Sequence, residues 1–229
     1  STLFPYTTLF RSLFIGGAES ADTITALAGF ANMTALSSSG TSKPFDTTRD
    51  GFVLPTSFAR TGMHRREPAR LRGEIARHLE ILERDITARD GAPKRFGDRD
   101  TPLVLAVRGG SALSMPGILS TVVFVGMNDE IAKALAQDGP WRAYDSYRRF
   151  LASYAAAAWG VDLEPYGLVE TAKQQHGVRY KQELPWEAMR EVAEQSKHVL
   201  RRLGFGPQLD EILTDPFAQL VGAANAVMD

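Results

Sequence analysis

The sequence of 229 residues contains no cysteine, which excludes disulfide bonds and thiolate metal sites and fits a cytoplasmic protein. It also has almost no net charge, because 26 basic side chains are balanced by 27 acidic ones. No overall field would draw such a chain onto nucleic acid or anionic lipid, so we expect neither partner. Its four histidines are scattered and lack metal-ligand spacing. The first apolar run, residues 13–17, is too short for a signal peptide or a membrane span.

What is present is the composition of a globular protein, with 44% hydrophobic and 23% charged residues. Apolar residues at steps of three and four predict a helix over about residues 67–89. The continuous apolar run at 102–107 predicts a strand buried on both faces. The residues of the helical stripe are Leu71, Ile75, Leu79, Leu82 and Ile86.

The remainder of the chain predicts helices with clear boundaries. Asn128 is placed to cap one helix, and an aromatic stripe continues from Trp141 to a stop at Gly160. A shorter helix is expected to end at Gly177. Two more are expected, one from Pro185 to Gly204 and one after Asp215-Pro216. The fold class that follows is α+β and predominantly α.

The most informative segment joins the predicted strand to a loop rich in small residues. The strand would deliver Arg108 beside backbone N–H groups that can approach a phosphate closely, so the segment predicts a polyphosphate site. No lysine follows in the loop, so this is not a Walker motif. The candidate nucleotide-binding residues are Arg108, Gly109, Gly110, Ser111 and Ser114.

Each polar candidate has a structural alternative. Arg108 could pair with a local acid such as Asp98 or Asp100. Ser114 could cap the turn before Met115-Pro116 instead of donating to a phosphate.

Three separated motifs resemble the pyruvate, phosphate dikinase and phosphoenolpyruvate synthase family. They are Val-Arg-Gly-Gly-Ser-Ala-Leu-Ser-Met-Pro-Gly at 107–117, Asn-Asp at 128–129 and Tyr-Asp-Ser-Tyr-Arg-Arg-Phe at 144–150. The resemblance covers residues 51–229. It implies an incomplete ATP-grasp-like domain with a helical subdomain, in which Arg108 binds ATP phosphate. It also implies ATP and Mg²⁺ as cofactors and a homodimeric parent enzyme.

Other family features are expected to be structural or to lie elsewhere. Arg148 and Arg149 match the family signature, and we expect them to form surface ion pairs. His176, at a predicted helix end, is expected to be a solvated cation and not the phosphorylated histidine of the family. The resemblance places the magnesium-binding carboxylates beyond residue 229.

The loop departs from the family pattern in ways that weaken the expected chemistry. The second loop arginine of the family is replaced by Ala112 or Leu113, the serine after the first arginine by Gly109, and an aspartate by Ser120. Phosphoryl transfer depends on several cations, so we expect weak nucleotide binding and no activity from this chain alone.

The first part of the chain has a different character. Residues 1–12 look like a translated adapter and are left out of the fold prediction. Residues 13–53 resemble a fragment of a β-ketoacyl carrier-protein synthase, most specifically at 44–53, and are not expected to fold independently. Together with a partial nucleotide-binding domain at 54–229, this predicts a chimeric chain. Two alternative functions remain, carrier-protein acyl transfer, for which no thiol nucleophile is present, and a helical interaction module.

Overall fold

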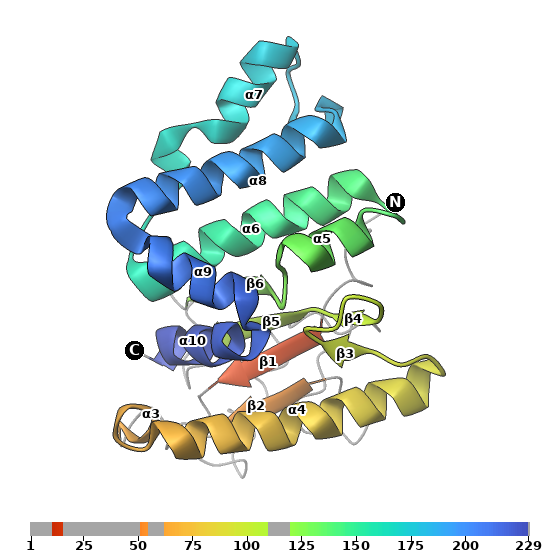
Figure 1. Ribbon diagram of the computed structural model, residues 1–229, viewed down its shortest axis with the longest axis vertical. Helices are drawn as coiled ribbons and strands as arrows, with labels where there is room; N and C mark the ends of the chain where they lie inside the picture. Colours follow the sequence, from red (N-terminus) through yellow and green to blue (C-terminus); the bar gives the residue numbers. More distant parts are fainter. Residues whose placement is uncertain (1–10, 16–50, 55–61, 110–119, 229) are drawn as a thin grey trace, which may run out of the picture.

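The computed structural model describes residues 11–15, 51–54, 62–109 and 120–228. These residues form a layered arrangement in which a small sheet lies between one long helix and a stack of helices (Figure 1). Helix α4 lies on one side of the sheet, while α6, α8 and α7 follow one another on the other side (Figure 1). Most described residues are helical, so the predicted α+β, predominantly α class is confirmed.

The central sheet has four strands in the order β2-β1-β5-β6. Strand β1 (Arg11–Ile15) is parallel to both β2 (Gly51–Leu54) and β5 (Leu105–Gly109). Strand β6 (Thr121–Val125), which the sequence analysis did not predict, is antiparallel to β5. Strand β1 includes two residues that were left out of the fold prediction, and the proposed domain boundaries stay predictions.

The predicted strand at 102–107 is two strands in the structure. Strand β4 (Pro102–Leu103) pairs with β3 (Arg95–Phe96) in a separate two-stranded sheet, and β5 begins after Val104. The prediction of burial was right, because the side chains from Leu103 to Val107 are at most 4% exposed. The split could not be seen in an unbroken apolar run.

Helix α4 (Pro68–Asp90) follows a short helix α3 (Met63–Arg66) and confirms the predicted apolar stripe. All five residues of the stripe are buried, with Leu71 and Ile75 fully inaccessible to solvent. Gly91 ends the helix in a left-handed conformation, as expected for a helix C-terminus.

Helices α5 (Asp129–Leu135) and α6 (Pro140–Trp159) also match the prediction. The Asn128 side chain accepts a hydrogen bond of 2.9 Å from the backbone N–H of Ile131, which is the predicted N-cap. The aromatic stripe of α6 is core at its tyrosines, because Tyr144, Tyr147 and Tyr154 are at most 8% exposed.

The C-terminal helices are α7 (Leu168–His176), α8 (Trp186–Leu200), α9 (Gly206–Thr214) and α10 (Pro216–Met228). Short 3-10 turns occupy Glu164–Tyr166 and Lys181–Glu183, and a kinked turn spans Arg201–Phe205. Helix α9 was not predicted. The predicted cap at Asp215 is confirmed, because its Oδ1 accepts from the N–H groups of Phe217 and Ala218.

None of the described helices combines the length and the apolar character needed to cross a membrane.

Candidate functional site

The candidate nucleotide contact, Arg108, is the penultimate residue of β5. In the sheet, Arg108 lies opposite Phe14 of β1 on one side and Thr121 of β6 on the other. Beyond it, the N–H of Gly109 donates to the carbonyl of Ser120 at 3.1 Å. An arginine at the end of a buried strand is therefore present, as the sequence predicted.

The Arg108 side chain is partly buried, and this burial lowers the pKa of its guanidinium. Its Nε atom is buried and has no hydrogen-bond partner within the described ranges. The guanidinium still carries its charge at neutral pH, because an arginine pKa is far above that range. A buried cationic donor without a partner is unfavourable unless a ligand or another group satisfies it.

The alternative role for Arg108, an ion pair with a local acid, is not found in the described part of the chain. Asp98 instead accepts hydrogen bonds from the backbone N–H groups of Asp100 and Thr101, at 2.7 and 2.9 Å. These bonds lower the pKa of Asp98. No ion pair joins Arg108 to Asp98 or Asp100 among these residues.

The rest of the predicted loop cannot be placed around Arg108. Gly110, Ser111 and Ser114 lie outside the described residues, and only Gly109 is inside them. The assembly of a complete phosphate site therefore stays a prediction.

Arg148 does not form the surface ion pair that was expected. Its side chain is only 13% exposed, and it donates at 2.8 Å to Oδ1 of Asp145, which is completely buried. Lys181 donates to the same oxygen at 2.9 Å. The expectation was wrong because Asp145 points into the interior, where two cations neutralise it.

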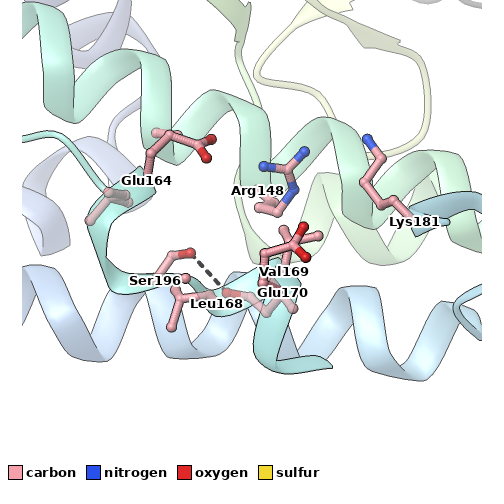
Figure 2. Close-up of a pocket in the computed structure, with 11 residues that line it drawn as sticks. Arg148, Glu164, Leu168, Val169, Glu170, Lys181 and Ser196 are labelled. Carbon is pink, nitrogen blue, oxygen red and sulfur yellow. Dashed lines mark hydrogen bonds between the residues drawn. The ribbon is translucent and has the colours of Figure 1, made fainter. Parts of the chain in front are cut away.

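These two cations border a pocket of about 190 Å³ between α6, α7 and α8. In Figure 2, Arg148 lies between Glu164 and Lys181, with Glu170 and Ser196 nearby. The Ser196 hydroxyl is occupied by a 2.8 Å hydrogen bond to the carbonyl of Val192. The walls of the pocket therefore carry both acidic and basic side chains, and its two cations are already paired with Asp145.

The guanidinium of Arg149 lies over the ring of Phe124, 5.3 Å from its centroid, and the surface ion pair expected for Arg149 stays a prediction. His176 is the last residue of α7 and is exposed, as expected.

Sequence reasoning missed a polar cluster around Asp129. Its Oδ1 accepts from Lys197 at 2.7 Å and from the hydroxyl of Tyr147 at 2.9 Å. Lys197 also lies 2.9 Å from Glu194, and its side chain is only 5% exposed. Lys197 and Asp129 are 68 residues apart, so no local sequence pattern could have indicated this contact.

Within the described residues, no group of three or more histidine, aspartate or glutamate side chains could hold a metal ion. The family resemblance places the magnesium-binding carboxylates beyond residue 229, so the magnesium site stays an expectation.

Comparison with known proteins finds relatives among the pyruvate, phosphate dikinases. The chain is 36% identical over 158 residues to the chloroplastic pyruvate, phosphate dikinase of Mesembryanthemum crystallinum, which covers 68% of this chain and 16% of that protein. It is 33% identical over 182 residues to the pyruvate, phosphate dikinase of Entamoeba histolytica, covering 77% and 19%. The Clostridium symbiosum enzyme is 34% identical over 137 residues, covering 58% and 15%. No protein-family model matches the chain.

These relatives are phosphotransferases by name, and the matched part of the chain corresponds to a segment of such enzymes. The chain belongs to the pyruvate, phosphate dikinase family. It spans about one sixth of the length of the plant relatives it matches. The relatives give no support to the acyl-transfer alternative.

Proposed function

We propose that this chain is part of the nucleotide-binding region of a pyruvate, phosphate dikinase, and that Arg108 contacts the phosphates of ATP. The observation that carries the proposal is the partly buried guanidinium at the end of β5, whose Nε has no partner among the described residues. A polyphosphate is a ligand that would satisfy such a group, because charge-assisted hydrogen bonds to phosphate are strong.

The names of the relatives suggest the reaction of the whole enzyme, transfer of phosphate groups involving pyruvate and phosphate. Catalysis of this kind depends on positioning and on cations that neutralise the charge of the transferred group. The loop of this chain has one arginine where the family pattern has two. We therefore propose that it binds ATP weakly and does not complete the reaction by itself.

The test is a titration of the full chain with ATP and magnesium, in which binding is measured by calorimetry or by the shift in melting temperature. Replacing Arg108 with glutamine removes the charge and keeps similar bulk. We expect affinity to fall by about tenfold, the effect of losing one charge-assisted hydrogen bond.

The matched control is Arg84→Gln, because Arg84 is 73% exposed on α4 and pairs only with its neighbour Asp85 in the described structure. This variant should bind ATP like the wild type. An equal loss of ATP affinity in both variants would mean that the effect comes from the net charge of the chain and not from a contact by Arg108. Equal affinity of Arg108→Gln and wild type would remove the role proposed for Arg108.

A further inference from the structure

We infer that a second pocket, at the other end of β5, binds a small carboxylate with an apolar body. The pocket has a volume of about 130 Å³ and lies where the start of β5, the end of β6, helix α5 and the first turns of α6 meet. Its walls are mainly apolar. They are formed by Val104, Phe124, Met127, Leu135 and Ala143, and the polar lining residues are Asp138, Arg142 and Ser146.

One buried hydroxyl in this lining has no hydrogen-bond partner in the described structure. Ser146 is only 2% exposed, and its Oγ is among the buried polar atoms left unsatisfied. A buried hydroxyl without a partner is unfavourable, and an acceptor or donor atom of a ligand in the pocket would satisfy it. The hydroxyl therefore marks where the polar end of a ligand can bind.

The charge of the expected ligand follows from Arg142 and from the start of α6. The Arg142 guanidinium lies against Gly139, so close that a side-chain carbon at Gly139 would be 3.0 Å from its Nη2 atom. No ion pair joins Arg142 to Asp138 or to another acid among the described residues. Gly139 is also the N-cap of the 20-residue helix α6 and provides no side-chain cap. A cation beside a positive helix end favours an anion.

Asp138 also lines the pocket, and its negative charge disfavours the binding of an anion there. It is exposed, whereas Arg142 is half-buried, so water screens the carboxylate of Asp138 more effectively than the guanidinium of Arg142. We therefore expect a single negative charge on the ligand and not a polyphosphate.

The size of the ligand follows from the volume. An apolar cavity of about 150 Å³ accommodates one benzene ring, so this pocket suits a ring or a short branched chain. Benzoate is a suitable probe because it combines one ring with one carboxylate. Benzyl alcohol has a similar shape and no charge.

This pocket is distinct from the proposed nucleotide contact. Val104 immediately precedes β5, and Arg108 is four residues further along the chain, a separation of roughly 13 Å for an extended strand. The inference does not depend on ATP binding, and its failure would leave the role proposed for Arg108 untouched.

The experiment titrates the full chain with benzoate and with benzyl alcohol, and follows the methyl signal of Met127 by NMR. Benzoate should bind at least about fivefold more tightly than benzyl alcohol, because Arg142 contributes a charge-assisted contact. Arg142→Gln should abolish this preference. Ser146→Ala should weaken benzoate binding by about fivefold while raising the melting temperature of the free protein, because it removes an unsatisfied buried hydroxyl.

The control variant is Arg202→Gln, an exposed arginine outside the lining, which should leave benzoate affinity unchanged. Near-ultraviolet circular dichroism establishes that each variant is folded before titration. The inference is overturned if the Met127 signal does not move at millimolar benzoate, or if both probes bind equally. It is also overturned if Arg142→Gln and Ser146→Ala bind benzoate like the wild type.

Discussion

At the scale of single residues, the ammonium group of Lys197 is a nearly buried ion. Its side chain is only 5% exposed, while its partner Asp129 remains 46% exposed. Burying a charge is costly unless it is paired, and here Asp129, Glu194 and the ring of Tyr147 surround the ammonium. This arrangement holds α8 against the start of α5.

We expect Lys197→Met to destabilise the folded chain by about 1–2 kcal/mol at pH 7. The loss is smaller than for a fully buried pair, because Asp129 can be hydrated once its partner is removed. Urea unfolding measures the change. The control is Lys133→Met, since Lys133 is 63% exposed and its solvated pair with Glu130 should contribute much less to stability. Similar losses in both variants would contradict the importance given to burial.

The same pair should make stability depend on pH. Burial by itself raises the pKa of Asp129, but the hydrogen bond and the charge of Lys197 outweigh it and hold the pKa below its usual 3.8. A lowered pKa in the folded state means that the contribution is complete above the unfolded value and is lost as pH falls through the folded value. The difference between wild type and Lys197→Met should therefore persist from pH 7 to about pH 5 and shrink below about pH 4. A difference that stays constant down to pH 3 would contradict this assignment.

At the scale of helices and strands, local signals were read correctly from the sequence and distant pairings were not. The stripe of α4 and the cap at Asn128 depend on neighbours within a few residues, so spacing alone revealed them. Strand β6 is short, and Phe124 in it has a positive φ of 59°, which breaks the alternation by which a strand is recognised. Helix α9 was not predicted, because Gly204 is typical of a helix end and the next expected helix begins only after Asp215.

The candidate site shows the same division. The position of Arg108 at a strand end followed from one continuous segment of sequence. The pairing of Lys181 with Asp145 joins residues 36 positions apart, and only the packing of α6 with the turn before α8 brings them together. Physical reasoning on residue type cannot supply such contacts without the fold.

Two glycines should respond in opposite ways to alanine. Gly73 is exposed within α4, and nothing lies within 4 Å of an added Cβ, so Gly73→Ala should stabilise the chain by about 0.5–1 kcal/mol. Gly204 has a φ of 95° at the kink between α8 and α9, and Gly204→Ala should cost about 1–2 kcal/mol although space is available. Thermal unfolding of both variants provides the measurement. Stabilisation by Gly204→Ala would show that the kink can be straightened without cost.

A buried amide connects helix α10 to the sheet. Oε1 of Gln219 accepts from the N–H of Gly126, while its Nε2 donates to the carbonyls of Met127 and Ile212 at 3.0 and 2.9 Å. Gln219→Leu would leave these three backbone groups without the amide, so we expect a loss of about 3 kcal/mol or more in urea unfolding. Gln208→Leu, at an exposed position of α9, should change stability by less than about 0.5 kcal/mol. A small loss at Gln219 would mean that water replaces its bonds.

At the scale of the whole molecule, one continuous hydrophobic cluster joins the layers. It includes Leu71 of α4, Val107 of β5, Phe150 of α6 and Leu220 of α10. Helix α4 and the helical stack lie on opposite sides of the sheet (Figure 1), and α10 also contacts α4 directly, with the Arg72 guanidinium 5.1 Å from the centroid of the Phe217 ring. A core of this kind favours cooperative unfolding.

The tryptophans provide a direct test of this cooperativity, because Trp141 and Trp159 belong to α6 and Trp186 begins α8. Leu71→Ala removes buried apolar atoms from α4 and should cost about 2–5 kcal/mol. If the layers unfold together, the midpoints from tryptophan fluorescence and from far-ultraviolet circular dichroism should fall equally. Glu80→Ala, at an exposed position of the same helix, should move neither midpoint appreciably. A fluorescence midpoint that stays unchanged in Leu71→Ala would mean that the helical stack unfolds independently of α4 and its sheet contacts.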